Sequence, residues 1–550
     1  VLAPAITFSS GVLDGMQLEA GDKATEFDAP TLSGKLVADT DDGVGFFESG
    51  KPQSIALELS TLKPEFKGKV TVSVKNFYRE TVLSFEKDMA FHKGDYPLLT
   101  IPVPEKGFAD GVYSIELKSG AEVSHFRFSV MPFLKNQHAT AKIFSPSYGG
   151  FWGYVDECSG TYLKRLQQIG YGCQGHTPSI GPKVLALYQK YGIIPFDGGA
   201  VSRAPIQRYK KIFPELADKL VTGHVYFGVM DNWYPIWEMV KEKGILADYR
   251  LLNGWNDQYK AKFQEAVKTE LKKNPGRFAY GIGGEWPEEI KGDPHYPDLV
   301  LAYFEAVKSV YPDAYPYEQG SANLQIRDGV AEYDRFLGQI KERWPIKLVS
   351  GHPYNGDPSE FYDQFMAFLG VLEKHGLKDV MIAFPEFMHF YPYGAPLWDC
   401  NPISAEKNSI KLPLSYDLGW TEQISAAYYA QCYLICMIKF KQMICVTSAV
   451  TSTTNLRLDI DLIPRVSQKV INTLGTLLGN PKEFLGDCSF GTKVRCFVWE
   501  SEDSTPLAAV WSEEKQLSSG FVPFPKVTFN YPDAQFIDLM GVIRTPEVKG

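Results

Sequence analysis

Two stretches decide how this chain folds: Phe278-Ala-Tyr-Gly-Ile-Gly-Gly-Glu285-Trp-Pro and Val380-Met-Ile-Ala-Phe-Pro-Glu386-Phe-Met-His-Phe. In each stretch a short apolar run breaks off into a glutamate flanked by aromatic and proline residues. Short apolar runs of this kind are typical of strands that are buried on both faces of a parallel sheet. We therefore predict two buried parallel strands, each of which ends in a glutamate.

Six more such runs lie between about residue 140 and residue 480, so that eight strands are predicted in all. The strands are expected at Lys142–Pro146, Gly172–Gly175, Ile193–Asp197, Phe278–Gly283, Ala314–Tyr317, Lys347–Ser350, Val380–Phe384 and Met443–Val446. Amphipathic helices are expected at Thr161–Ile169, Lys183–Lys190, Gln258–Lys273, Pro297–Val310, Ala331–Arg343, Glu360–His375, Trp420–Lys439 and Pro464–Leu478. Strands and helices that alternate in this way indicate repeated βα units.

The number of strands separates a closed barrel from an open, doubly wound sheet. An open nucleotide-binding sheet carries a glycine-rich phosphate loop, and the sequence contains neither GxGxxG after the first strand nor GxxxxGK[ST]. Eight βα units without a phosphate loop favour a (β/α)8 TIM barrel. The long aromatic segment between the third and fourth strands is predicted to be an elaborated loop.

The sequence on either side of these units alternates with a period of two. In the N-terminal part Val70, Val72 and Val74 alternate with polar residues. The same pattern returns at Lys493–Glu500, Pro506–Trp511, Lys526–Tyr531 and Gln535–Leu539. Such alternation is typical of antiparallel β-sandwiches. We expect an N-terminal sandwich at 1–138, the barrel at 139–480, and a second sandwich, either complete or incomplete, at 481–550.

Composition excludes several classes of protein. A net charge of -9 and a pI near 5.6 argue against a nucleic-acid binder, which needs a basic face. The chain has no apolar run long enough to span a membrane. It lacks HExxH, GxSxG and clustered histidines, so that neither a metal site nor a serine nucleophile is indicated, and no cofactor is expected. The eight cysteines show no CxxC spacing, and Cys432 and Cys436 are predicted to be buried thiols on one helix face.

On this map Glu285 follows the fourth strand and Glu386 follows the seventh, and catalytic groups of such barrels lie at the carboxyl ends of strands. The arrangement resembles the clan-A glycoside hydrolases over about residues 140–480. The resemblance implies a retaining mechanism, with Glu285 as the acid/base and Glu386 as the nucleophile. His352-Pro-Tyr354 after the sixth strand matches a motif that in this clan supports the nucleophile and lines the sugar subsite. The sequence departs from the clan at Gly284, where most members have asparagine.

The chemistry requires two carboxyl groups in different protonation states. The acid must stay protonated to donate to the leaving oxygen, and Trp286 and Pro287 beside Glu285 can reduce its hydration and raise its pKa. Glu386 must be ionised to attack the anomeric carbon. Retention predicts that the two carboxyl groups lie about 5–5.5 Å apart, and inversion predicts about 6.5–9.5 Å.

Several other side chains are candidates for contact with a sugar. Glu318 is a third carboxyl group near the end of the fifth strand, and His176, Asp197 and His389 follow the second, third and seventh strands. Aromatic rings stack on the C–H faces of sugars, and Trp152, Trp233, Trp286 and Tyr393 are candidates for this role. For each residue the alternative is an ordinary structural role. The basic run at 203–211 is either a site for anionic glycans or a solvated helix face.

The sequence thus predicts a retaining glycoside hydrolase that cleaves β-linked oligo- or polysaccharides. Two alternatives stay open: a noncatalytic glycan-binding protein on the same barrel, which the Gly284 departure favours, and a transglycosylase. A glycan substrate and a chain that begins at Val1 without an initiator methionine suggest a location outside the cytoplasm. The oligomeric state is left open.

Overall fold

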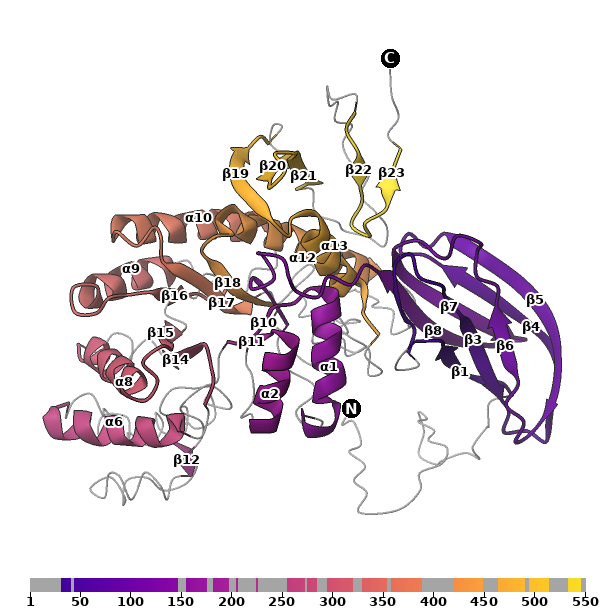
Figure 1. The fold of residues 1–550 in the computed structure, drawn as a ribbon, viewed down its shortest axis with the longest axis horizontal. Coiled ribbons are helices and arrows are strands. Elements are labelled where there is room, and N and C mark those ends of the chain that lie inside the picture. The colour runs from indigo at the N-terminus through magenta and orange to yellow at the C-terminus, as the bar shows by residue number, and fades with distance from the viewer. Residues whose placement is uncertain are drawn as a thin grey trace, which may run out of the picture.

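The structure is a computed structural model. It describes residues 31–40, 44–146, 155–175, 182–196, 204–205, 224–225, 255–272, 275–283, 294–319, 329–353, 358–387, 420–448, 463–489, 494–513 and 533–545. Over these residues the fold is mixed α/β and contains several sheets (Figure 1).

Two sheets form the N-terminal part of the molecule. The first contains β1 (Ser33–Ala38), β3 (Ile55–Ser60) and β6 (Leu98–Ile101), and the second contains β2 (Phe46–Glu48), β8 (Glu122–Met131), β7 (Gly111–Ser119), β4 (Glu65–Lys75) and β5 (Thr81–His92). Strand β2 runs parallel to β8, and the other neighbours are antiparallel. Side chains of both sheets share one hydrophobic core, to which Leu57, Val72 and Phe128 belong. The predicted alternation in β4 is confirmed, because its three valines are fully buried and the residues between them are not.

All eight strands predicted in the middle of the chain are present. They are β9 (Phe144–Pro146), β10 (Cys173–Gln174), β11 (Ile194–Pro195), β14 (Ala279–Gly283), β15 (Tyr315–Gln319), β16 (Leu348–Ser350), β17 (Met381–Phe387) and β18 (Met443–Ser448). Short strands β12 (Ala204–Pro205) and β13 (His224–Val225) pair with each other inside the predicted long loop. The eight strands fall into three parallel ladders, in the orders β10-β11, β14-β15 and β16-β17-β18-β9.

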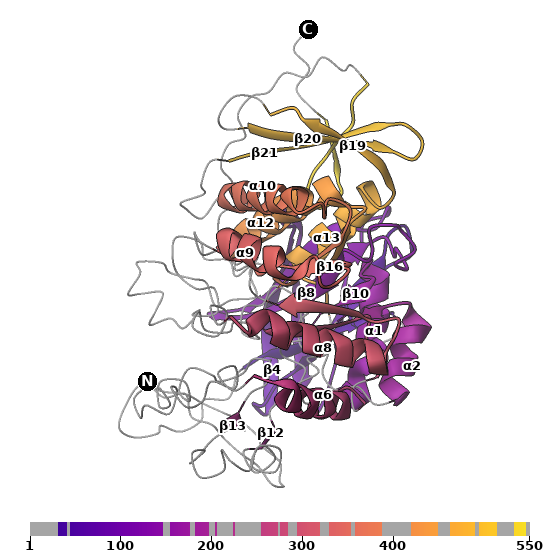
Figure 2. The ribbon, with the colours of Figure 1, turned by 90° about the vertical axis from the view of Figure 1, so that its left-hand side faces the viewer.

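Helices follow these strands as the periodicity predicted. They are α1 (Val155–Ile169), α2 (Pro182–Tyr191), α6 (Asp257–Leu271), α8 (Tyr296–Val310), α9 (Gly329–Ile340), α10 (Pro358–Lys374), α12 (Trp420–Cys436), the 3-10 turn η4 (Met437–Lys439) and α13 (Val466–Leu477). The helices flank the parallel strands, and α1 and α13 lie on the side that faces the N-terminal sheets (Figures 1 and 2). Cys432 and Cys436 are both buried on α12, as predicted.

Hydrogen bonds outside the ladders link the three groups of parallel strands. Phe278 N–H donates to the carbonyl oxygen of Pro195 at 3.0 Å, which joins β14 to β11. The hydroxyl of Ser350 donates to the carbonyl oxygen of Glu318 at 2.7 Å, which joins β16 to β15. Gly175 N–H donates to the Ser145 hydroxyl at 2.7 Å, which joins β10 to β9.

The side chains of the parallel strands separate into two sets. One buried cluster combines residues contributed by or next to β10, β11, β14, β15, β16, β17 and β18. Its members are Cys173, Phe196, Ala279, Tyr317, Leu348, Ala383, Ile444 and Cys445. Their neighbours in sequence, such as Tyr280, Val349 and Phe384, belong to the larger core that includes the helices. The strands therefore have one face toward each other and one toward the helices, as period-two alternation requires.

A three-stranded antiparallel sheet follows the last helix, α13. It consists of β19 (Pro481–Asp487), β20 (Val494–Ser501) and β21 (Pro506–Ser512), and it lies over α10 and α12 (Figure 2). Trp499 of β20 is fully buried, and its indole N–H donates to the carbonyl oxygen of Met437 at 3.1 Å. The sheet is thereby packed on the helices rather than standing free.

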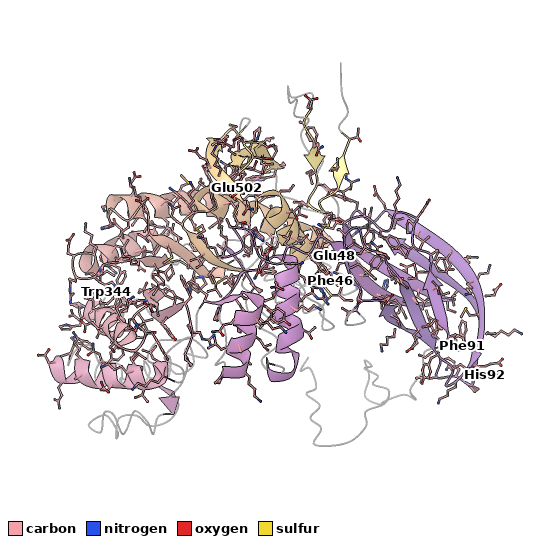
Figure 3. The ribbon with its side chains drawn as sticks, viewed as in Figure 1. Phe46, Glu48, Phe91, His92, Trp344 and Glu502 are labelled. Carbon is pink, nitrogen blue, oxygen red and sulfur yellow. The ribbon has the colours of Figure 1, made fainter. Side chains whose placement is uncertain are left out.

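The N-terminal sheets contact the helices and the last hairpin at one end. Phe46 and Glu48 lie at that end, and Phe91 and His92 lie at the opposite tip (Figure 3). The guanidinium of Arg165 on α1 stacks 4.1 Å above the Phe46 ring. The hairpin β22 (Phe536–Ile537) and β23 (Ile543–Arg544) reaches the same end, where Asp538 accepts a 2.7 Å hydrogen bond from the Tyr78 hydroxyl.

Candidate functional site

Strands β14 and β17 are the two strands next to which the sequence places the candidate catalytic glutamates. Strand β14 ends at Gly283, two positions before Glu285 in the sequence. The backbone of Glu386 lies within β17, which runs to Phe387 instead of ending at Phe384 as predicted. Because the strands of each ladder are parallel, their carboxyl ends face the same way. Glu386 therefore lies at the carboxyl end of β17, and Glu285 itself lies outside the described residues.

The longer strand β17 has a physical explanation in its pairing with β18. Ala383 pairs with Ile444, Phe384 pairs with Val446 and Phe387 pairs with Ser448, so that the register shifts twice. Proline cannot donate a ladder hydrogen bond and is tolerated in strands at such irregularities. Pro385 lies at the second shift, and the ladder continues past it. The predicted end of this strand at Phe384 is therefore three residues short of the observed end at Phe387.

Most of the predicted site residues lie outside the described part of the chain. Glu285, Trp286, His176, Asp197, Trp233, Tyr354 and His389 are among them, as are Trp152 and Tyr393. Of Glu386 the structure describes the backbone, and of the basic segment 203–211 it describes β12. These assignments remain predictions.

His352 is described, and it lies directly after β16. His352 is 1% exposed, and Ser350, the last residue of β16, is fully buried. Strand β16 pairs with β17 through Leu348, Val349 and Ser350, which pair with Met381, Ile382 and Ala383. The histidine therefore follows the strand next to the one that carries Glu386.

Glu318 lies inside β15 and not beyond its end. Its side chain is 3% exposed, and its Oε1 accepts a 2.7 Å hydrogen bond from the hydroxyl of Tyr296 in the first turn of α8. The next residue back, Tyr317, belongs to the cluster between the strands. Because successive side chains of a strand point to opposite faces, Glu318 is directed toward the helices. This placement favours the structural alternative for Glu318 over contact with a sugar.

The Glu318 charge acts on a second buried tyrosine. Burial raises the pKa of Tyr333 on α9 well above its usual value, and the negative charge of Glu318 raises this pKa further. Tyr296 and Tyr333 come from neighbouring helices, and both side chains are buried. Two tyrosines and one carboxylate thus fix the helix ends beside β15 and β16. Sequence patterns carry no signal for this group, because its members come from three different elements, α8, β15 and α9.

A second polar group connects the carboxyl ends of β9, β10 and β18. The Thr447 hydroxyl donates to the Ser145 hydroxyl at 2.9 Å, and Ser145 accepts the Gly175 N–H. A Cβ atom at Gly175 would lie 2.2 Å from Thr447 Oγ1, so only glycine fits there. The neighbouring Cys445 has a φ of 52°, a left-handed conformation that is strained for a non-glycine residue. Such strain concentrates at functional sites, and sequence reasoning missed this group.

No group of three or more histidine, cysteine, aspartate or glutamate side chains that could hold a metal ion occurs among the described residues. Within the same residues, no helix is both long enough and apolar enough to cross a membrane.

Comparisons with known proteins gave a structural likeness only. No protein-family model matches the chain, and no characterised protein matches it in sequence. Among solved structures, a beta-glucuronidase from Dictyoglomus thermophilum is 10% identical over 81% of this chain and 68% of that chain, with a TM-score of 0.34. One from an uncultured Clostridium sp. is 10% identical over 81% of this chain and 67% of that chain, also with a TM-score of 0.34. Bacteroides uniformis beta-glucuronidase 2 is 11% identical over 90% of this chain and 60% of that chain, with a TM-score of 0.35. We argue function from the chain's own strands and side chains.

Proposed function

We propose that this protein is a retaining glycoside hydrolase in which Glu285 is the acid/base and Glu386 is the nucleophile. The observation that carries the proposal is that Glu386 lies at the carboxyl end of β17, the seventh of eight strands, while β14, the fourth, ends two positions before Glu285 in the sequence. Catalytic residues of barrel enzymes come from the carboxyl ends of several strands. The buried His352 after the sixth strand supports the same assignment.

We further propose that the eight strands close into a (β/α)8 barrel in their chain order. This closure is supported by the three parallel ladders and by the buried cluster that seven strands share. It is also supported by the hydrogen bonds that join β11 to β14, β15 to β16, and β9 to β10. On this proposal residues 139–480 form the catalytic domain. The sheets at 1–138 and 481–550 form the flanking domains.

The proposed reaction has two displacements. Glu285 donates its proton to the glycosidic oxygen while the Glu386 carboxylate attacks the anomeric carbon, so that the leaving sugar departs and a glycosyl-enzyme forms. Glu285, now ionised, takes a proton from water, and the water oxygen attacks the same carbon and releases Glu386. Two inversions at one carbon give net retention. A carboxyl separation of about 5–5.5 Å is expected.

The remaining predicted residues have supporting roles in this proposal. His352 and Tyr354 hold the nucleophile and line the sugar subsite, and Trp286 and Trp233 stack on sugar rings. Polar side chains contact the sugar hydroxyls, namely His176, Asp197 and His389. Glu318 has a structural role, because its carboxylate accepts a hydrogen bond from Tyr296 and so links β15 to the first turn of α8. The substrate is a β-linked glycan, and the site of action is outside the cytoplasm.

The test is proton NMR of the anomeric signal during turnover of a panel of aryl β-glycosides and β-linked glycans. The expected result is a first-formed β product, with turnover lost in both Glu386→Gln and Glu285→Gln. The matched control is Glu305→Gln, which removes an exposed carboxylate on α8 that pairs with Lys260 at 2.8 Å, and which is expected to leave turnover intact.

Three outcomes would contradict the proposal. A first-formed α product would replace double displacement by inversion. Full turnover in Glu386→Gln would show that Glu386 is not the nucleophile. If the wild type binds oligosaccharide but releases no reducing ends, the protein is a glycan-binding protein.

A further inference from the structure

The C-terminal sheet places two cysteines opposite each other on neighbouring strands. Asp487 at the end of β19 pairs with Phe497 of β20 in an antiparallel ladder, so the next pair is Cys488 and Cys496. Cys488 N–H donates to the carbonyl oxygen of Cys496 at 2.7 Å, which shows that the pairing continues to these residues. We propose that Cys488 and Cys496 are a disulfide-forming pair that joins the end of β19 to β20.

The spacing of an antiparallel pair suits a disulfide bond. Residues directly opposite each other in antiparallel strands have Cα atoms about 4.5–5.5 Å apart. Disulfides join cysteines whose Cα atoms lie about 4.4–6.8 Å apart. Cysteines paired in this way therefore fall within the Cα range that a disulfide bond spans.

Both thiols are on the same face of the sheet. Asp487 and Arg495 are joined by a 3.1 Å hydrogen bond, and the Arg495 guanidinium stacks 4.2 Å above the Tyr362 ring of α10. Asp487 and Arg495 therefore face α10. Since side chains alternate along a strand, Cys488 and Cys496, which follow them, are directed to the opposite face.

The two thiols differ in solvent exposure, and this difference determines which thiol reacts first. Cys488 is exposed, and Cys496 is 2% exposed. Burial raises the pKa of the Cys496 thiol, and the nearby Cys488 raises it further, consistent with two sulfur atoms that lie close together. The exposed cysteine is thus the one that meets an oxidant first.

The oxidant is a small-molecule disulfide such as oxidised glutathione. The Cys488 thiolate attacks one sulfur of that disulfide, the S–S bond breaks, and one thiolate leaves. Cys496 then loses its proton and attacks the Cys488 sulfur, which releases the second thiolate. In total the two protein thiols lose two protons and two electrons, and one disulfide is reduced to two thiols.

Other thiol pairs of the described chain lack this access. Cys173 and Cys445 lie near each other between the parallel strands, and both are fully buried. Cys432 and Cys436 on α12 are also fully buried. They provide internal controls within the same molecule, because an oxidant that reaches Cys488 does not reach them.

The test incubates the folded protein with oxidised glutathione, blocks free thiols after denaturation, and maps peptides by mass spectrometry without reduction. The expected result is a peptide pair that links Cys488 to Cys496, with an intact mass lower by two hydrogen atoms. Cys496→Ser is expected to stop at the mixed disulfide between Cys488 and glutathione. Cys488→Ser is expected to form neither product.

The proposal is overturned if Cys488 remains a free thiol or a mixed disulfide in the wild type. It is equally overturned if Cys488 is linked to Cys400, to Cys158 or to a second copy of the chain. The controls Cys432 and Cys436 are expected to be blocked as free thiols in every sample.

Discussion

The hydrogen bond between Tyr296 and Glu318 predicts a measurable loss of stability in Tyr296→Phe. The hydroxyl donates to a buried carboxylate at 2.7 Å, and the tyrosine side chain is 1% exposed. Hydrogen bonds to charged groups contribute about 1.5–3 kcal/mol, whereas bonds between neutral groups contribute about 0.5–1.5 kcal/mol. Phenylalanine keeps the ring and its packing. We therefore expect the free energy of unfolding to fall by about 1.5–3 kcal/mol.

Tyr433→Phe is the matched control for this variant. Tyr433 is fully buried, and its hydroxyl donates to the neutral carbonyl oxygen of Val446 at 2.8 Å. The two substitutions remove the same atom from the same kind of ring, and they differ in the charge of the acceptor. The control is expected to lose about 0.5–1.5 kcal/mol.

The assay is urea unfolding of the two variants, of Glu318→Gln and of the double variant Tyr296→Phe with Glu318→Gln. The midpoints are compared at an unchanged slope, and the cycle isolates the coupling between the two side chains. We expect a coupling of about 1–2 kcal/mol. The reasoning is refuted if Tyr296→Phe costs no more than Tyr433→Phe, or if the coupling is zero.

Two further predictions concern the joint between the N-terminal sheets and the helices. Burial lowers the pKa of His138 to about 4. Between about pH 6.5 and pH 4 the unfolded chain therefore binds a proton that the folded chain does not. The free energy of unfolding falls by about 1.4 kcal/mol per pH unit as the pH drops through this range. Denaturant unfolding at several pH values should show that His138→Gln flattens this slope, while His92→Gln at the far tip of β5 leaves it unchanged (Figure 3); an equal slope in both would contradict the burial argument. Lys469 is 1% exposed, and its Nζ lies 3.3 Å from an Asp110 carboxylate oxygen. In thermal unfolding, Lys469→Met should lower the free energy of unfolding by about 1.5–3 kcal/mol. The exposed control Lys260→Met should lower it by less than about 1 kcal/mol. Equal losses would show that the buried pair contributes no more than a surface pair.

The element order was readable from the sequence because it depends on local patterns. Each of the eight apolar runs became a strand, and each amphipathic stretch became a helix. The predicted ends of the strands were less accurate than their number and order. Strand β15 extends to Gln319 and β17 to Phe387, because pairing with a neighbouring strand prolongs a ladder beyond what the residue types favour.

The position of a carboxyl group at a strand end was also readable, and the direction of its side chain was not. Glu318 occupies a position like those of the candidate glutamates, and only the tertiary structure turns it toward Tyr296. The face to which a strand residue points depends on register and on bulges. Both are set by the partner strand, which lies far away in the sequence.

The sequence by itself determined the alternation of strands and helices, the period-two flanking sheets, and the glutamates near the ends of the fourth and seventh strands. These features follow from hydrophobic periodicity, which is a local property. Only the tertiary structure decided which groups meet. The contacts of Ser145 with Thr447, of Tyr296 with Glu318 and of Cys488 with Cys496 depend on strand register and helix packing, for which a single sequence carries no local signal.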